Sequence, residues 1–145
     1  MSWVAIRAKI KAKLDGLVVA GTLGHVYNGE QMKQSMDVPV YPCAELIRAQ
    51  SEPEYFTNRE DMQSYVFLIR LLTPLTGDDW DTQEIAMDPV VDAVVQAFLD
   101  DADLTGSVDG RIEPIAMSAV AHTWGGKLHR ADTVTLKCRK ITGMA

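Results

Sequence analysis

Hydrophobic residues recur every three or four positions in two segments, and this spacing predicts two helices. The first covers residues 2–17, where its apolar face consists of Trp3, Ile6, Ile10, Leu14 and Leu17. The second lies within residues 82–101 and is clearest from Asp88, which can cap a helix, followed by Pro89 in the first turn. Its apolar face is formed by Val91, Val94, Val95, Phe98 and Ala102.

Alternating apolar and polar residues predict four strands. The first covers residues 38–49, where prolines restrict pairing near its start, and Ser51–Pro53 predicts a break after it. Residues 64–72 predict a central strand, because alternate positions from Tyr65 to Leu71 are apolar. Residues 112–124 and 130–141 predict a terminal hairpin.

The order of these elements predicts an α+β fold. It is helix, two strands, helix, two strands, and it suggests one mainly antiparallel sheet of about four strands with both helices on one face. We expect a single domain over residues 1–145 with a long loop around residues 18–37. The alternative for that loop is a partial strand around His25–Tyr27.

Composition narrows the class of protein. The chain has 145 residues, 47% of them hydrophobic, which suits one compact domain. Its net charge of −6 disfavours general binding to nucleic acid or anionic membranes. The N-terminus lacks the features of a signal peptide, and no apolar run approaches a membrane span, so we expect synthesis and use in the cytoplasm.

Candidate chemistry is sparse. A hairpin could bring His122 near His129, with Asp132 beside them, but ordinary histidines are the favoured interpretation over a metal site. Cys43 and Cys138 lack zinc-site spacing and are predicted to be buried thiols. We therefore predict no catalytic residue, cofactor or metal.

Charged residues are segregated along the chain. Residues 78–103 contain nine acids and no Lys or Arg, whereas basic residues concentrate in the first helix and the terminal hairpin. If the fold keeps these groups apart, copies can pack head to tail, and such contacts form rings. The equally weighted alternative is that the fold mixes the charges on its surface.

Several segments together resemble the tail terminator (tail completion, head–tail joining) proteins of long-tailed bacteriophages. They are the opening helix, REDMQSYVFLIRLL at residues 59–72, DPVVDAVVQAFLDDADLTG at residues 88–106 and HRADTVTLKCRKI at residues 129–141. The resemblance implies an α+β fold with helices on one side of a small sheet. It also implies a non-catalytic virion protein that forms a six-membered ring at the head-proximal end of the tail tube, ends tube growth and docks the head connector.

The resemblance implies a defined set of partners. They are other copies of the chain, the tail tube protein, the head–tail connector or stopper protein, the sheath protein if the tail is contractile, and DNA that passes through an acid-lined bore without specific binding; no membrane is involved. The place of action would be the tail or neck of the virion, after assembly in the host cytoplasm. Residues expected to bind partners lie in the loops around residues 24–36, 52–59 and 76–81 and in the hairpin. They are Tyr27, Asn28, Glu30, Lys33, Tyr55, Phe56, Asp78, Asp79, Trp80, Asp81, Arg130 and Arg139.

Three alternatives remain open at this level. One is another phage neck or tail component, namely a head completion or stopper protein or a tube protein. The second is a bacterial adaptor domain that uses its basic helix on an acidic partner. The third is a small-ligand or nucleotide-handling enzyme that uses His122, His129 and carboxylates.

Overall fold

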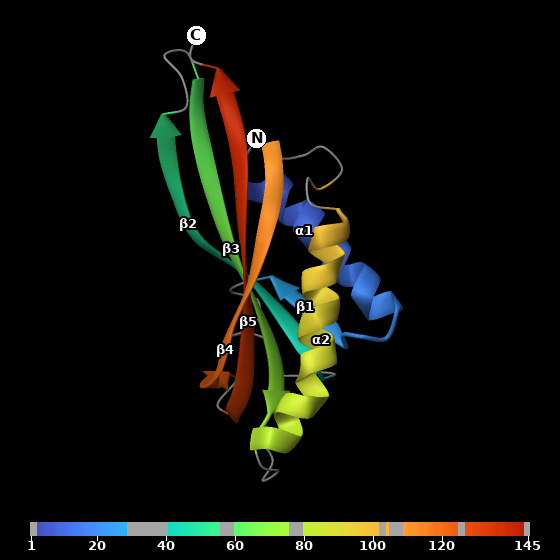
Figure 1. Cartoon of the computed structure of the whole chain (residues 1–145). Helices are drawn as coiled ribbons and strands as arrows, with labels where there is room; N and C mark the ends of the chain where they lie inside the picture. The colour runs from blue at the N-terminus through green and yellow to red at the C-terminus, as the bar shows by residue number, and fades with distance from the viewer. Residues whose placement is uncertain are drawn as a thin grey trace.

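The computed structural model describes residues 3–28, 41–55, 60–75, 80–101, 104, 109–124 and 127–143 (Figure 1). Its elements are α1 (Trp3–Val19), β1 (His25–Asn28), β2 (Cys43–Tyr55), β3 (Glu60–Pro74), α2 (Trp80–Asp100), β4 (Asp109–Trp124) and β5 (Lys127–Gly143). The chain is therefore an α+β domain, as the sequence predicts.

The strands form one five-stranded mixed sheet in the order β1-β2-β3-β5-β4. Strand β1 pairs in parallel with the first four residues of β2, Cys43–Leu46, and all other pairs are antiparallel. The prediction of about four strands was wrong in number, because the sheet has a fifth strand, and this strand pairs in parallel. The fifth strand is the short one at His25–Asn28, so the alternative of a partial strand inside residues 18–37 is confirmed.

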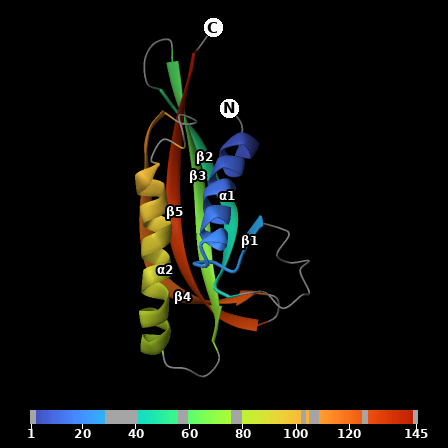
Figure 2. The same ribbon diagram turned by 90° about the vertical axis from the view of Figure 1, so that its right-hand side faces the viewer.

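Both helices lie on the same face of the sheet (Figures 1 and 2). Helix α1 contacts β1 and β2, and α2 contacts β4 and β5. No helix of the described ranges lies on the other face of the sheet, and we call it the open face. The predicted two-layer arrangement is thus confirmed.

The core lies between the helices and the sheet. Alternate residues of β3 from Tyr65 to Leu71 point into it, and Phe67 and Ile69 sit opposite Leu136 and Val134 of β5. The helices contribute Ile6, Ile10, Leu14, Met87, Val94 and Phe98, all fully or almost fully buried. Burial of one such aliphatic or aromatic side chain contributes roughly 1.5–3 kcal/mol, so this interlocked set supplies the main driving force for the fold.

Strand β2 continues beyond its predicted end. It passes through Ser51–Pro53, where the sequence predicts a break, after a register shift between Arg48 and Gln50. Beyond Leu46, β2 no longer pairs with β1 and forms the edge of the described sheet. A proline at an edge position removes no hydrogen bond between strands. The local break signal is therefore overridden by pairing with β3.

Helix α2 begins earlier than predicted, at Trp80, so that Asp88 is not its cap and Pro89 lies inside it. An internal proline removes a helical hydrogen bond and costs about 3 kcal/mol or more. Tertiary contacts hold the turns before it: Met87 is buried, and the side-chain amide of Gln83 donates to the carbonyl of Pro74 at 2.8 Å. These contacts offset the cost of the proline.

Candidate functional site

A buried arginine joins the first turn of α2 to strand β5. Arg130 is 1% exposed, and its Nε and Nη2 donate to the carboxylate of Asp132 at 3.1 and 3.2 Å. Nη2 also reaches Glu84 at 3.3 Å, and Nη1 donates to the carbonyl of Trp80 at 3.2 Å. Burial alone would lower the pKa of Arg130, but the hydrogen bonds and charges of Asp132 and Glu84 outweigh it and raise the pKa.

This cluster brings together two residues that the sequence proposes for partner binding. The guanidinium of Arg130 lies 4.6 Å from the centre of the ring of Trp80. Trp80 as a residue is 38% exposed. The Arg130 charge is thus used inside the subunit, whereas an edge of the Trp80 ring stays available at the surface. Asp81, also predicted, is exposed in the first turn of α2.

The open face carries an apolar patch on β4. Ile115, Met117 and Val120 are 57%, 55% and 57% exposed. They pair with Thr135, Thr133 and Ala131 of β5, which alternate with its core residues, so all three side chains lie on the open face. Sequence reasoning missed this patch, although the absence of any Lys, Arg, Asp or Glu from Pro114 to Trp124 could have revealed it.

Charged groups also lie on the open face, outside this patch. Arg70 of β3 pairs with Glu45 of β2 at 3.7 Å. Arg139 of β5, a predicted partner-binding residue, is half-buried there, and its Nε has no hydrogen-bond partner among the described residues. A buried donor without a partner costs free energy, so an acceptor supplied by a partner would stabilise it.

Histidines and tyrosines meet where β1, β2 and β5 begin. The Tyr41 hydroxyl and Nε2 of the buried His129 are 2.7 Å apart. His122 is the cross-strand neighbour of His129, as the hairpin prediction anticipated. Burial, then Arg70, then His129 lower the pKa of His122. Asp132 does not join them, because it lies on the helix-covered face with Arg130.

The two thiols are buried and lie apart. Cys43 packs with Leu72 and Ala131, whereas Cys138 belongs to the main core beneath the helices. Strand β3 separates their strands. Burial raises the pKa of each thiol to about 12. Neither thiol is therefore poised as a nucleophile, and both are free.

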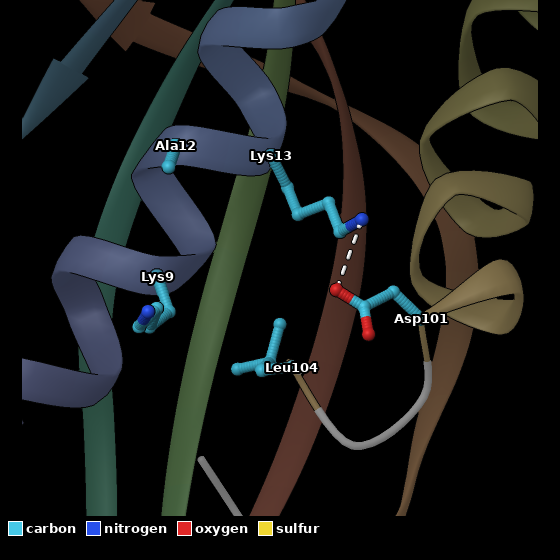
Figure 3. A pocket seen from close by; sticks show the side chains of 5 residues that line it. All are labelled: Lys9, Ala12, Lys13, Asp101 and Leu104. Carbon is cyan, nitrogen blue, oxygen red and sulfur yellow. Dashed lines mark ion pairs between the residues drawn. The ribbon is translucent and has the colours of Figure 1, made fainter. Parts of the chain in front are cut away.

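An open pocket of about 270 Å³ lies between α1 and the C-terminal end of α2 (Figure 3). Lys9, Ala12, Lys13, Asp101 and Leu104 line it. Nζ of Lys13 and Oδ2 of Asp101 form an ion pair across it at 3.0 Å, at the point where the two helices come together. The lining consists of this ion pair, a second lysine and two apolar side chains. The ion pair links the two helices, and the described lining offers no convergent set of reacting groups.

The remaining predicted partner-binding residues are scattered. Tyr27 is half-buried on β1, with its ring 4.4 Å from that of His25, and Asn28 ends the same strand. Tyr55 ends β2. Five other predicted residues, Glu30, Lys33, Phe56, Asp78 and Asp79, lie outside the described residues. The structure thus brings Trp80, Asp81 and Arg130 together at one end of α2, and places Tyr27, Tyr55 and Arg139 elsewhere on the sheet.

Models of known protein families and the sequences of curated proteins show no match to the chain. Within the described ranges, no three His, Cys, Asp or Glu side chains are grouped so that they could hold a metal ion. Neither helix in these ranges has the length and apolar content needed to cross a membrane. The described surface carries the apolar patch on β4, the partly exposed Trp80 and the exposed acids of α2.

Proposed function

We propose that the chain is a structural subunit of a bacteriophage tail terminator. In this function, six copies form a ring at the head-proximal end of the tail tube, end tube growth and provide the docking surface for the head connector. The role is non-catalytic, and the ring acts in the tail or neck of the virion. The proposal originates in the resemblance of the sequence segments to that family.

The observation that carries the proposal is the apolar patch of Ile115, Met117 and Val120 on the open face. Each side chain is more than half exposed in the single subunit. Contiguous exposed apolar residues on an edge strand favour association and are usually covered by a partner. A subunit that works only within an assembly accounts for such a surface, and a monomeric enzyme or carrier does not.

The acids of α2 also support the proposal. Asp81, Asp88, Asp92 and Asp100 are exposed, and the helix has no Lys or Arg. A carboxylate-rich wall repels phosphates, so acids that face the bore would let DNA pass without sticking. The helix also supplies the negative surface that a basic neighbour would bind.

The test is electron microscopy of gold-labelled protein mixed with purified tails that lack a terminator. We expect label at the head-facing end, and we expect tubes to keep their length when tube subunits are added. Label along the shaft would instead indicate a tube or sheath component, and absence of binding would favour a bacterial adaptor domain or a small-ligand enzyme.

Two variants make this test specific. Met117→Asp places a charge in the middle of the apolar patch and should abolish end labelling if the patch is used in the assembly. Thr123→Asp introduces the same charge at an exposed position near the end of β4 and serves as the matched control. Equal labelling by both variants would show that the patch plays no part in tail binding. Circular dichroism would establish that each variant is folded.

A further inference from the structure

Strand β4 is exposed on both of its faces over its second half. Ile115, Met117 and Val120 are exposed on the open face. Ala116 and Ala121 lie on the opposite face, because their partners on β5 are buried beneath the helices, yet both alanines are exposed as well. The helices of the described ranges therefore leave this half of the strand uncovered.

The same half of β4 has a free edge. Within the described ranges, β5 pairs with one side of β4 and no strand pairs with the other side (Figure 1). The unpaired backbone groups of an edge strand are a template for another strand, and natural edges often carry charges that prevent such pairing. Residues 114–124 contain no Lys, Arg, Asp or Glu. This edge therefore lacks the charges that would keep another chain away.

The charges that flank this stretch favour pairing with its own copy. The first charged residue before it is Glu113, and the first after it is Lys127. Antiparallel pairing of two copies sets the Glu113 end of each strand beside the Lys127 end of the other, so opposite charges come near each other. Parallel pairing would bring like charges together instead. The uncharged centre also keeps like charges apart, although each copy carries a net charge of −6.

We propose that two copies of the chain pair through β4, antiparallel, about a two-fold axis between Ser118 and Ala119. The two five-stranded sheets then continue into each other at this edge. A two-fold contact uses the same surface of both copies and closes a dimer. The inference goes beyond the proposed function, because it concerns the chain in solution before it joins a ring on a tail.

This register keeps the two faces of the joined sheets consistent. Directly opposite residues of antiparallel strands lie on the same face. On the open face, Met117 is then opposite Val120 of the second copy, and on the other face Ala116 is opposite Ala121 of the second copy. The bulge of β4 between Met117 and Val120 lies at the axis, so the bulges of the two copies meet each other. A register shifted by one residue would set residues of opposite faces against each other.

The test is sedimentation velocity of two double variants that differ in one side chain. Ala116→Lys with Ala121→Lys sets lysines opposite each other across the contact and should weaken dimerisation roughly tenfold or more. Ala116→Lys with Ala121→Glu sets a lysine opposite a glutamate and should leave the dimer at least as tight as that of the wild type. Both positions are exposed in the single subunit, and circular dichroism would establish that both variants are folded.

A control adds the same charges outside the contact. Val4→Lys with Val19→Lys on the exposed positions of α1 should leave the dimer unchanged. A wild-type chain that stays monomeric at its highest soluble concentration would overturn the inference and leave the edge for a strand of another protein. A six-membered ring in place of a dimer, or equal dimerisation by the two β4 variants, would also overturn it. End labelling of tails is a separate measurement, so failure of the dimer leaves the proposed function standing.

Discussion

The guanidinium of Arg130 lies over the ring of Trp80 at 4.6 Å and donates to the carbonyl of the same residue at 3.2 Å. One residue belongs to the last strand and the other begins α2, so a single buried cation fixes the N-terminal turn of the helix on the sheet. The exposed edge of Trp80 is held in place by the same contact. The buried guanidinium of Arg130 therefore positions Trp80, which is predicted to bind a partner.

We expect Arg130→Met to destabilise the protein by about 3–5 kcal/mol, because it leaves Asp132, which is 6% exposed, as a buried charge without its partner. Urea unfolding followed by fluorescence measures the loss. The double variant Arg130→Met, Asp132→Leu removes both charges and should be more stable than Arg130→Met alone. If the double variant were less stable by the sum of the single losses, the two groups would not be coupled.

The adjacent residues Phe98 and Leu99 provide an internal comparison of burial. Phe98 is fully buried and Leu99 is 42% exposed. We expect Phe98→Ala to cost about 3–5 kcal/mol, since it opens a cavity in the core. Leu99→Ala should change the free energy of unfolding by about 1 kcal/mol or less. Similar losses at the two positions, measured by urea unfolding, would contradict the orientation of α2.

The lowered pKa of His122 makes stability depend on pH. The unfolded chain takes up a proton near the ordinary pKa of 6.5, whereas the folded chain does so only at lower pH. Stability should therefore fall as pH drops below about 6.5. His122→Gln should reduce this fall, measured as the change in urea midpoint between about pH 7.5 and pH 5.5. An identical pH dependence in the variant would show that other groups cause the fall.

The buried thiols should resist alkylation. With a pKa of about 12, against 9.0 for an ordinary thiol, Cys43 and Cys138 hold roughly a thousandfold less thiolate near neutral pH. Iodoacetamide should therefore modify the native protein only as fast as it opens, and modify it quickly in urea. Because the unfolded thiols ionise first, stability should also decrease as pH rises above 9. Rapid labelling of either thiol in the native state would show that it is accessible.

Long alternating segments made much of the fold predictable. Strand β3 is bordered by strands on both sides and packs beneath the helices, so the pattern from Tyr65 to Leu71 directly reflects its environment. The stripe of Ile6, Ile10 and Leu14 identifies α1 for the same reason. Strand β1 has only four residues, too few for a period to be visible, and its place is fixed by a parallel partner far along the chain.

The candidate surfaces were less predictable, because the role of a charged side chain depends on the residues that surround it in the folded structure. Arg130 reads as a surface cation in a basic hairpin, yet it occupies the same side of β5 as Val134 and Leu136. Alternation alone could have placed it inside. Its charge is balanced by Asp132 on the same strand and by Glu84 from another element, and no local pattern connects Glu84 to it.

The position of β5 has a consequence for how the chain folds during synthesis. This strand is made last among the described elements, yet it lies inside the sheet, where it pairs with β3 on one side and β4 on the other. Residues of β3 such as Leu68 can pair only after residues of β5 such as Thr135 have been synthesised. Contacts between residues so far apart in the sequence slow folding. Until β5 leaves the ribosome, the long edge of β3 is unpaired and prone to mispairing, so the nascent chain should depend on chaperones most just before its final strand emerges.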